Sequence, residues 1–590
     1  MRATWLISAA ALLTIGAGAA ASKKTPNLFE SPERPTPSSQ IDKLVFAKLS
    51  SLGLAPVRCS DAVFVRRAYL DIIGTLPTAK EARDFISSPN KNKRRLLIDQ
   101  LLERDEFADY WAMKWGDILR IKAEFPVNLW PNAAQAYHRW VRASIVENKP
   151  YDKFVRGLLT SSGSNFRVGP VNFYRALQNR TPEGTATAVA LTFMGSRAES
   201  WPKDRLAGTS VFFAQVGYKP TREWKEEHVF WDPFLSAETA AKSEESTSEP
   251  PKSNAAKPKP GAAPPAPPAP PIIKPPLDAV FPDGTKIHLS PSRDPREVFA
   301  DWLITPKNPW FTRNIANRIW AWLLGRGIIH EPDDIRANNP PSNPALLAYL
   351  EQELIASHYN LKHLYRLILN SETYQFSSMP RGNLAQAESQ FASYPVRRLE
   401  AEVLIDAVNK ITGTTDLYTS PIPEPFTYIP AEKPAIAIAD GSITSPFLTL
   451  FGRSARATGL ENERDNKPVS AQWLHMLNSS HIQTKLNQGA AIKAIFESGQ
   501  KPERIIEELY LTILSRLPTP AEVARAMEYG KASFAAKPPV APVAAKGKKS
   551  GKGKAAPVAK PPKINPVQKH DDWVDIAWSL INSPEFLYRH

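Results

Sequence analysis

Charged side chains are concentrated in the stretch 453-RSARATGLENERD-465 of this 590-residue chain. Two carboxylates can act as general acid and base in glycoside hydrolysis if one of them is desolvated. Arginines beside them can bind sulfate or carboxylate groups through paired hydrogen bonds. The same composition is also typical of an intramolecular network of ion pairs. The candidates are Glu461, Glu463 and Asp465 as catalytic carboxylates, and Arg453, Arg456 and Arg464 as ligand-binding cations.

A second candidate is the polar stretch 193-FMGSRAESWPKDRLAG-208. Its acid, base and packing groups are Arg197, Glu199, Trp201 and Asp204. One interpretation is a loop that is anchored by its tryptophan and closed by its own ion pairs. The other is an open pocket lined by Glu199 and Asp204.

The stretch 310-WFTRNIANRIWAWLLG-325 predicts a helix with one apolar face and a second face of polar i,i+4 pairs. Asparagine and arginine among tryptophans suit a wall that binds sugar hydroxyl groups. They also suit a buried polar network that locks two helices together, in which every polar group must be satisfied. The pairs are Arg313 with Asn317 and Asn314 with Arg318, and the smaller cluster Asp333, Asp334 and Arg336 leaves the same alternatives open.

Metal and cofactor sites find little support in the sequence. Cys59 is the single cysteine, so the chain cannot form a cysteine-based zinc site, an iron–sulfur cluster or a two-thioether attachment of c-type haem. The ten histidines form no i,i+4 pair, and there is no Gly-x-Ser-x-Gly or His-Glu-x-x-His motif. We therefore expect no metal site and no covalent cofactor.

Residues 1–21 resemble a secretory signal, with Arg2, an apolar run from Trp5 to Ile15, and small residues before position 22. The apolar run is short for a membrane span. We expect an exported protein of the periplasm or cell surface without a stable membrane span after cleavage. The alternative is a retained N-terminal anchor.

The formal net charge of +15 is unevenly distributed. Eight lysines between Lys537 and Lys563 lie in one Pro/Ala/Gly-rich tract without an acidic residue. Such a tract cannot bury a core, so it favours a loose contact with an acidic glycan, membrane or nucleic acid. A folded, specific nucleic-acid site is not indicated.

Two Pro-rich inserts, at 236–276 and 536–566, divide the chain and are predicted to be disordered. The fold class is mainly α, with little or no sheet, because helix-start signals are frequent and strand-like alternation is sparse. Asp294-Pro295 is one such start. The predicted parts are a signal at 1–21, helical domains at 41–232 and 277–535, and a C-terminal helix at 567–590 that completes the second domain.

An internal repeat lies near both ends of the fold. The segment 69-YLDIIGTLPTAKEARDFI-86 matches 510-YLTILSRLPTPAEVARAM-527. In each copy one helix ends, a proline turns the chain, and Thr-x-x-Glu predicts a capping box for the next helix. We expect one helix-turn-helix unit used twice.

Ordered motifs along both blocks carry a family resemblance. Through 41-IDKLVFAKLSSLGLAPVRCSDAVFVRRAYLDIIGTLPTAKEARDFI-86 and 107-FADYWAMKWGDILR-120, the first block resembles the planctomycete cytochrome-C-associated family, a domain of unknown function numbered 1549. The second block resembles its usual companion, numbered 1553, through the segments 294–329, 338–350, 396–408, 451–464 and 472–486. The resemblance implies an exported protein that is associated with polysaccharide or sulfated-glycan breakdown, without an assigned reaction.

Two departures from the family pattern fall on the charged stretches. Many members carry a Cys-x-x-Cys-His-like motif after the Met-Gly pair, where this chain has Met194-Gly195 followed by SRAESWPKD. Many also carry Cys-x-Cys-Glu-Arg where this chain has Leu460-Glu461-Asn462-Glu463-Arg464. We hypothesise that the two cysteine pairs serve one shared site elsewhere in the family, which predicts that both stretches are neighbours in the fold.

The sequence therefore favours a binding or scaffold component of an exported polysaccharide-handling system. Its expected partners are an anionic polysaccharide and a co-encoded sulfatase-like protein. The alternative is a glycan hydrolase that uses carboxylates near Glu461–Asp465. A covalent c-type haem carrier is excluded by the cysteine count.

Overall fold

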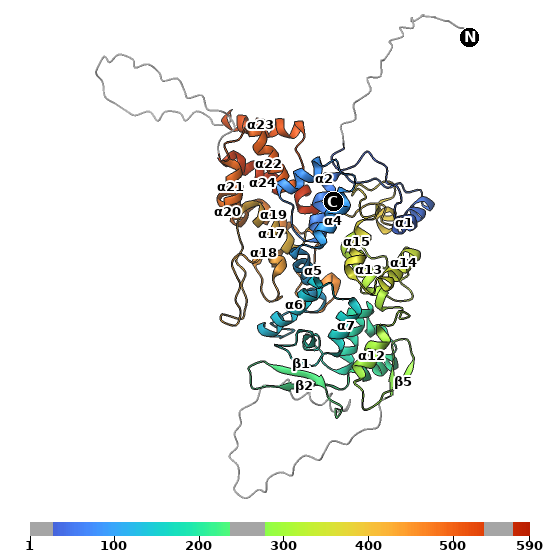
Figure 1. Cartoon of the computed structure of the whole chain (residues 1–590). Coiled ribbons are helices and arrows are strands. Elements are labelled where there is room, and N and C mark those ends of the chain that lie inside the picture. The colour runs from blue at the N-terminus through green and yellow to red at the C-terminus, as the bar shows by residue number, and fades with distance from the viewer. Residues whose placement is uncertain (1–26, 236–277, 536–569) are drawn as a thin grey trace, which may run out of the picture.

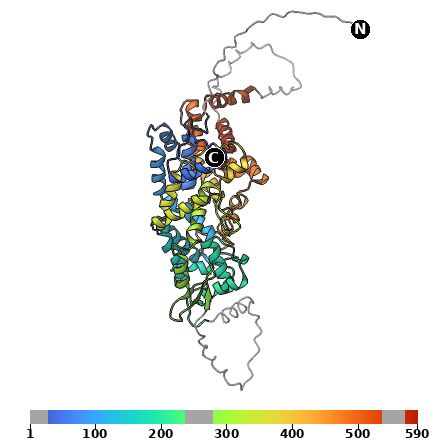
Figure 2. The same cartoon turned by 90° about the vertical axis from the view of Figure 1, so that its right-hand side faces the viewer.

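The computed structural model describes residues 27–235, 278–535 and 570–590 (Figure 1). The predicted signal at 1–21 and both predicted inserts, 236–276 and 536–566, lie outside these described residues. The molecule is elongated, with α22 (Pro502–Leu514) and α23 (Pro520–Ala535) at one end and a small sheet at the other (Figures 1 and 2).

The first segment is a succession of short helices followed by a β-hairpin. The helices are α1 (Gln40–Ser51), α2 (Asp61–Ile72), α3 (Ala79–Ser87), α4 (Lys93–Leu102), α5 (Asp105–Ile118), α6 (Pro131–Val146), α7 (Tyr151–Thr160), α8 (Asn172–Arg175), α9 (Pro182–Val189) and α10 (Lys203–Ser210). A π-helical turn η2 (Ala190–Met194) continues α9, and 3₁₀ turns are η1 (Gly169–Val171), η3 (Ala198–Ser200) and η4 (Val211–Phe213). The strands are β1 (Gly163–Ser164), β2 (Val216–Pro220) and β3 (Glu227–Trp231).

The second segment opens with a two-stranded ribbon and is otherwise helical. It holds β4 (Asp278–Val280), β5 (Lys286–His288), α12 (Pro295–Leu303), α13 (Phe311–Leu324), α14 (Pro344–Ala356), α15 (Leu361–Leu369), α16 (Leu384–Ser389), β6 (Arg397–Arg398), α17 (Ala401–Thr412), η5 (Ala435–Ala437) and α18 (Pro446–Leu450). After η6 (Glu461–Glu463) come α19 (Ser470–Asn478), α20 (Ser480–Gln488), α21 (Ala490–Phe496), α22 and α23. The chain ends with α24 (His570–Ile581), α25 (Pro584–Leu587) and β7 (Tyr588–Arg589).

The sheets are small and antiparallel, so the prediction of a mainly α fold is confirmed. One has the strand order β1-β3-β2, and the others are the pairs β4-β5 and β6-β7. The β6-β7 pair places Arg397 opposite Arg589, and the C-terminus lies beside α2 and α4 (Figure 1). This packing explains why Phe586, Leu587 and Arg589 are buried.

Local sequence signals place the helix starts as expected. The Asp294 side chain accepts a hydrogen bond from the Arg296 amide, and Pro295 takes the first helical position of α12. Both copies of the repeat form their capping boxes: Thr78 with Glu81 before α3, and Thr519 with Glu522 before α23.

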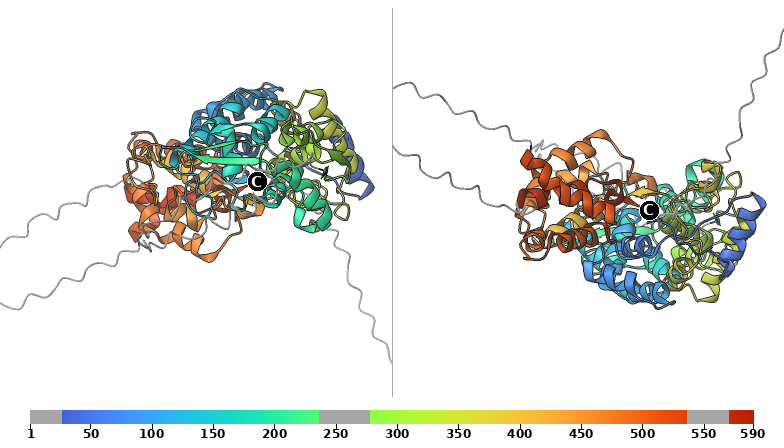
Figure 3. Two further views of the ribbon diagram at one scale, coloured as in Figure 1. Left: turned by 90° about the horizontal axis from the view of Figure 1, so that it is seen from below. Right: turned by 90° about the horizontal axis from the view of Figure 1, so that it is seen from above.

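The two helical segments share one hydrophobic core that extends from Ile41 to Leu587. In this core α1 packs on α14, α4 on α15, and α3 on α22, so elements far apart in sequence lie side by side (Figure 3). The buried Arg66 of α2 donates to the Ile513 carbonyl at 2.9 Å and to the Phe586 carbonyl at 2.8 Å. The two copies of the repeat thus touch each other, and the C-terminal segment closes the contact.

Candidate functional site

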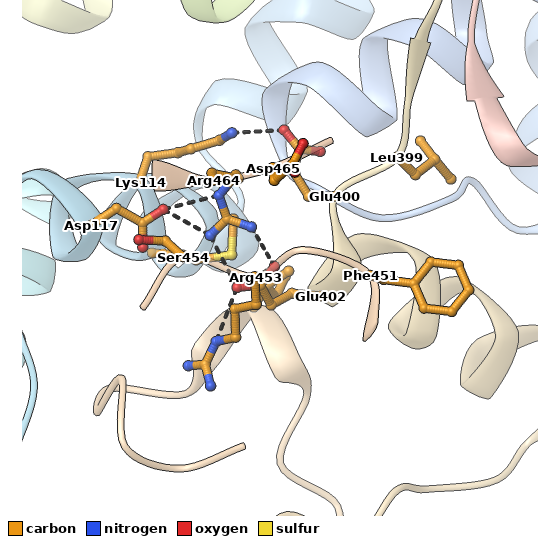
Figure 4. A network of polar contacts seen from close by, with 12 residues as sticks. Lys114, Asp117, Leu399, Glu400, Glu402, Phe451, Arg453, Ser454, Arg464 and Asp465 are labelled. Carbon is orange, nitrogen blue, oxygen red and sulfur yellow. Dashed lines mark hydrogen bonds and ion pairs between the residues drawn. The ribbon is translucent and has the colours of Figure 1, made fainter. Parts of the chain in front are cut away.

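The charged stretch 453–465 forms a buried network at the contact between the two segments (Figure 4). Arg464 is its centre. Its guanidinium contacts Asp117 of α5 at 2.7 Å and Glu402 of α17 at 2.6 Å. Because one arginine satisfies two buried carboxylates from different segments, the network joins them.

Two further arginines complete this network. Arg453 donates to Glu402 at 3.2 Å and to the Ile443 carbonyl. Arg456 is fully buried and donates to Asp117 at 3.0 Å and to the Ala439 carbonyl at 2.7 Å. Gly116 leaves room for it, because a Cβ there would lie 2.9 Å from the Arg456 guanidinium carbon. These arginines are bound by protein groups on several sides, which is the intramolecular alternative that the sequence left open.

The electrostatics of the network favour its ionised form. Burial by itself raises the pKa of the Glu402 carboxyl, but Arg464 and Arg453 outweigh burial and lower this pKa to about 2. Glu400 next to it bonds Lys114 at 2.6 Å and also Arg589. These two cations hold the pKa of Glu400 well below its usual range despite its burial.

The three candidate catalytic carboxylates have separate roles within the fold. Glu461 accepts from the Trp322 indole at 2.9 Å and from Arg318 at 3.3 Å, while burial raises its pKa. Glu463 accepts from the Ala457 amide at 2.9 Å and from the Thr458 amide at 3.3 Å. Asp465 is exposed and accepts from the Lys467 amide at 2.9 Å. None of the three lines the cleft that is described below.

The polar residues of α13 lie mainly inside the protein. Asn314 donates to the Thr192 carbonyl at 3.0 Å, and Asn317 both donates to and accepts from the Ile329 backbone. Arg318 is 1 % exposed and pairs with Asp333 at 2.6 Å. Arg313 is half-exposed and pairs with Glu351 at 2.9 Å. These side chains therefore tie α13 to its neighbours.

The stretch 193–208 begins with a tight backbone turn. Gly195 has φ +61°, and a Cβ there would lie 2.7 Å from Asn314 Oδ1 and 2.9 Å from the Pro332 carbonyl oxygen. The Ile335 amide donates to the Gly195 carbonyl at 2.8 Å, and Trp201 Nε1 donates to Ser196 at 3.1 Å. The expected tryptophan anchor is formed. The ion pairs of the first interpretation are not formed: among the described residues, the exposed Arg197, Glu199 and Asp204 have no oppositely charged partner within 4 Å.

A cleft of about 690 Å³ brings the two charged stretches together. Arg197 and Glu199 line it from one side, and Ala457, Thr458 and Leu460 from the other. The remaining wall is formed by α9 and the residues that precede it: Leu177, Gln178, Asn179, Glu183, Gly184, Thr187, Ala188 and Leu191, with Leu206 and Arg120. Asp204 is not part of the lining. The two stretches are therefore neighbours in the fold, as predicted.

Arg120 is the most unusual member of the lining. It is 4 % exposed with φ +58°, and its Nε donates to the Thr458 carbonyl at 2.9 Å. Gly459 makes room for it, because a Cβ there would lie 2.8 Å from the guanidinium carbon. Its Nη1 is buried without a hydrogen-bond partner, and burial lowers the pKa of Arg120. A buried water molecule would remove the cost of that unsatisfied donor.

Sequence reasoning missed Arg120, Asn179 and Glu183 as cleft residues. Asn179 and Glu183 flank a recognisable helix start, in which Thr181 caps α9 and Pro182 takes its first position. A polar helix start could have drawn attention to this wall. Nothing in the local sequence marks Arg120, because its place depends on contacts with residue 458, far along the chain.

Two features of the described residues bear on other site classes. No group of three or more histidine, cysteine, aspartate or glutamate side chains in the ranges that the structure describes is arranged to hold a metal ion. Within the same ranges, no helix combines the length and apolarity that a membrane crossing requires.

The protein is helical, and its two sequence blocks share one hydrophobic core and both line the cleft. Comparison with protein-family models matches residues 40–199 to the family described as "Protein of unknown function (DUF1549)" and residues 295–530 to "Protein of unknown function (DUF1553)". The chain therefore belongs to the proteins that pair these two families, as the motifs predicted. Both descriptions leave open a planctomycete origin and an association with cytochromes. No curated protein and no solved structure gives a match.

Proposed function

We propose that this chain is an exported binding component that holds an anionic, hydroxyl-rich ligand in the cleft beside α9. The ligand class is a short oligosaccharide with carboxylate or sulfate groups. The observation that carries the proposal is the cleft itself: the buried Arg120 and the exposed Arg197, which has no acidic partner within 4 Å among the described residues, line one cavity. Guanidinium groups recognise carboxylate and sulfate through charge-assisted hydrogen bonds.

The remaining lining suits sugar hydroxyl groups. Gln178, Asn179 and Thr187 supply donors and acceptors, and Glu183 and Glu199 supply further acceptors. Leucine and alanine side chains complete the wall, as is usual for sites that combine a few polar groups with apolar surface. We place the protein in the periplasm or at the cell surface, with a sulfatase-like enzyme as the partner that releases such ligands.

The test is isothermal titration of the purified protein with trigalacturonate and, separately, with a sulfated galactose trisaccharide. Arg197→Ala should weaken binding about tenfold or more, since a hydrogen bond to a charged group contributes roughly 1.5–3 kcal/mol. Lys203→Ala is the matched control, because Lys203 is exposed in the same stretch but does not line the cleft. Equal affinities for both variants and the parent protein would exclude the cleft as the binding site.

The alternative, a carboxylate-dependent glycan hydrolase, rests on the raised pKa of Glu461. A general acid needs such a pKa, but Glu461 is engaged by Trp322 and Arg318 and is not part of the cleft lining. Incubation of the same oligosaccharides with the parent protein and with Glu461→Gln separates the two functions. Release of reducing ends by the parent protein alone would establish the hydrolase.

A further inference from the structure

A row of aromatic side chains lies next to the β2–β3 hairpin, apart from the cleft. Trp224, in the hairpin loop, is 70 % exposed, and Phe426 is 51 % exposed. The ring of Trp130 lies 5.4 Å from that of Phe426, and Lys225 Nζ lies 5.4 Å from the Trp224 ring and 5.9 Å from the Trp130 ring. We call Trp130, Trp224, Phe426 and Lys225 the aromatic ledge.

Hydrogen bonds hold the hairpin loop that carries Trp224 and Lys225. Glu226 is 8 % exposed and accepts from Ser164 at 2.5 Å and from Thr221 at 2.7 Å, which closes the hairpin loop. Asn165 Nδ2 donates to the Lys225 carbonyl at 3.2 Å. Lys225 and Trp130 both have positive φ, +64° and +72°. Such backbone strain persists only where the surroundings fix it, so the exposed rings are presented in a defined arrangement.

A groove of about 490 Å³ adjoins the ledge. Its lining includes Trp224 and Lys225 together with Asn128, Arg175, Arg180 and Arg222. Arg175 is neutralised by Glu227 at 2.6 Å, and Arg180 lies 3.8 Å from the same carboxylate. Within the described residues, Arg222 and Lys225 are the basic members of this lining that have no acidic partner within 4 Å.

The groove and the cleft are neighbours along the chain. Arg175 and Arg180 line the groove, whereas Leu177, Gln178 and Asn179 between them line the cleft. A single segment of six residues therefore forms a wall of both cavities. A ligand with repeated units can contact the two in succession, which a single small molecule cannot do.

We infer that the aromatic ledge and its groove bind a polysaccharide strand that carries sparse acidic substituents. Exposed indole and phenyl faces stack on the apolar faces of sugar rings, and Arg222 and Lys225 can each donate hydrogen bonds to one acidic group. Densely charged nucleic acid fits less well, because Glu223, Glu226 and Glu227 share the lining. The inference rests on the proposed function for its ligand class, and it adds a second contact surface that selects polymers over short fragments.

The experiment compares a polymer with a fragment on the full-length protein. The polymer probe is polygalacturonate with most carboxyl groups methyl-esterified, with a lightly sulfated galactan as its sulfate counterpart, and the fragment is trigalacturonate. Affinity electrophoresis and titration are run on the parent protein, Trp224→Ala and Trp473→Ala. Trp473 is the matched control, because it is a half-exposed tryptophan on α19, far from the ledge in sequence and absent from the groove lining.

We expect Trp224→Ala to weaken binding of at least one polymer about tenfold, to leave trigalacturonate affinity unchanged, and to leave the melting temperature unchanged. Trp473→Ala should match the parent protein in all three. Unchanged polymer affinity in Trp224→Ala overturns the inference while the cleft proposal stands. Loss of fragment binding in Arg197→Ala without loss of polymer binding supports the ledge as a separate surface.

Two other outcomes also overturn the inference. One is self-association of the parent protein in sedimentation that Trp224→Ala abolishes, since the ledge would then be a contact between two copies. The other is tighter binding of single-stranded DNA than of either polymer, with loss in Trp224→Ala. If the parent protein binds neither polymer nor fragment, the proposed function fails together with the inference.

Discussion

The buried charge network around Arg464 and the cleft beside α9 differ in how their charges are paired. At the segment contact, the side chains of Arg464, Asp117 and Glu402 are buried and paired at 2.6–2.7 Å. At the cleft, Arg197 and Glu199 are exposed and unpaired among the described residues. The difference teaches that charge density in sequence does not locate a binding site. The charges of the buried network are paired within the protein, whereas those of the cleft are free to contact a ligand.

Removal of the central arginine should have the largest effect. Arg464→Ala leaves the Asp117 and Glu402 carboxylates buried without their shared partner, and breaking a buried ion pair in this way costs about 3–5 kcal/mol. Chemical denaturation should show this loss in the free energy of unfolding. Lys467→Ala, an exposed change nearby, serves as the control. A loss below about 1 kcal/mol for Arg464→Ala would contradict the structural role of the network.

The same network should limit stability in acid. The folded pKa of Glu402 is about 2, below the ordinary value of 4.5, so its stabilisation is present above pH 4.5 and is lost as the pH falls towards 2. The shift corresponds to about 3 kcal/mol. Unfolding free energies measured between pH 6 and 2.5 should decline for the parent protein and decline less for Glu402→Gln. Parallel pH curves for both proteins would argue against the role of this carboxyl.

A change at the turn that supports the cleft should have an intermediate effect. Gly195→Ala forces a Cβ against Asn314 and the Pro332 carbonyl in a left-handed backbone conformation, so we expect about 1–3 kcal/mol of destabilisation. Gly53→Ala is the control, because φ is similar at +68° but no atom lies within 4 Å of its Cβ. Equal melting temperatures for the two variants would show that the close contacts at Gly195 can relax.

The smallest effect on stability is expected inside the cleft. Arg197→Ala removes an exposed side chain without an ion pair, so the free energy of unfolding should change by less than about 0.5 kcal/mol. The same variant is expected to lose ligand affinity, which separates binding from folding. A melting temperature several degrees below that of the parent protein would place Arg197 with the structural charges instead.

The fold class and the capped helix starts were predictable from the sequence. The capping boxes at Thr78–Glu81 and Thr519–Glu522 follow from residue types three positions apart, and the structure contains both. The sequence also predicted that the two stretches that depart from the family pattern lie close together in the fold. The ion pairs that one interpretation placed within 193–208 are not formed among the described residues, because exposed side chains can leave their charges to solvent.

The sequence by itself determined which residues form helices, where those helices begin, and which stretches are rich in charge. These properties depend on side chains within one or two turns of each other. Only the tertiary structure decided which charges are paired, because Arg464 meets Asp117 and Arg120 meets Thr458 across more than three hundred residues. Such partners are set by the packing of the whole core. For the same reason the cleft, which needs walls from distant segments, exists only in the folded chain.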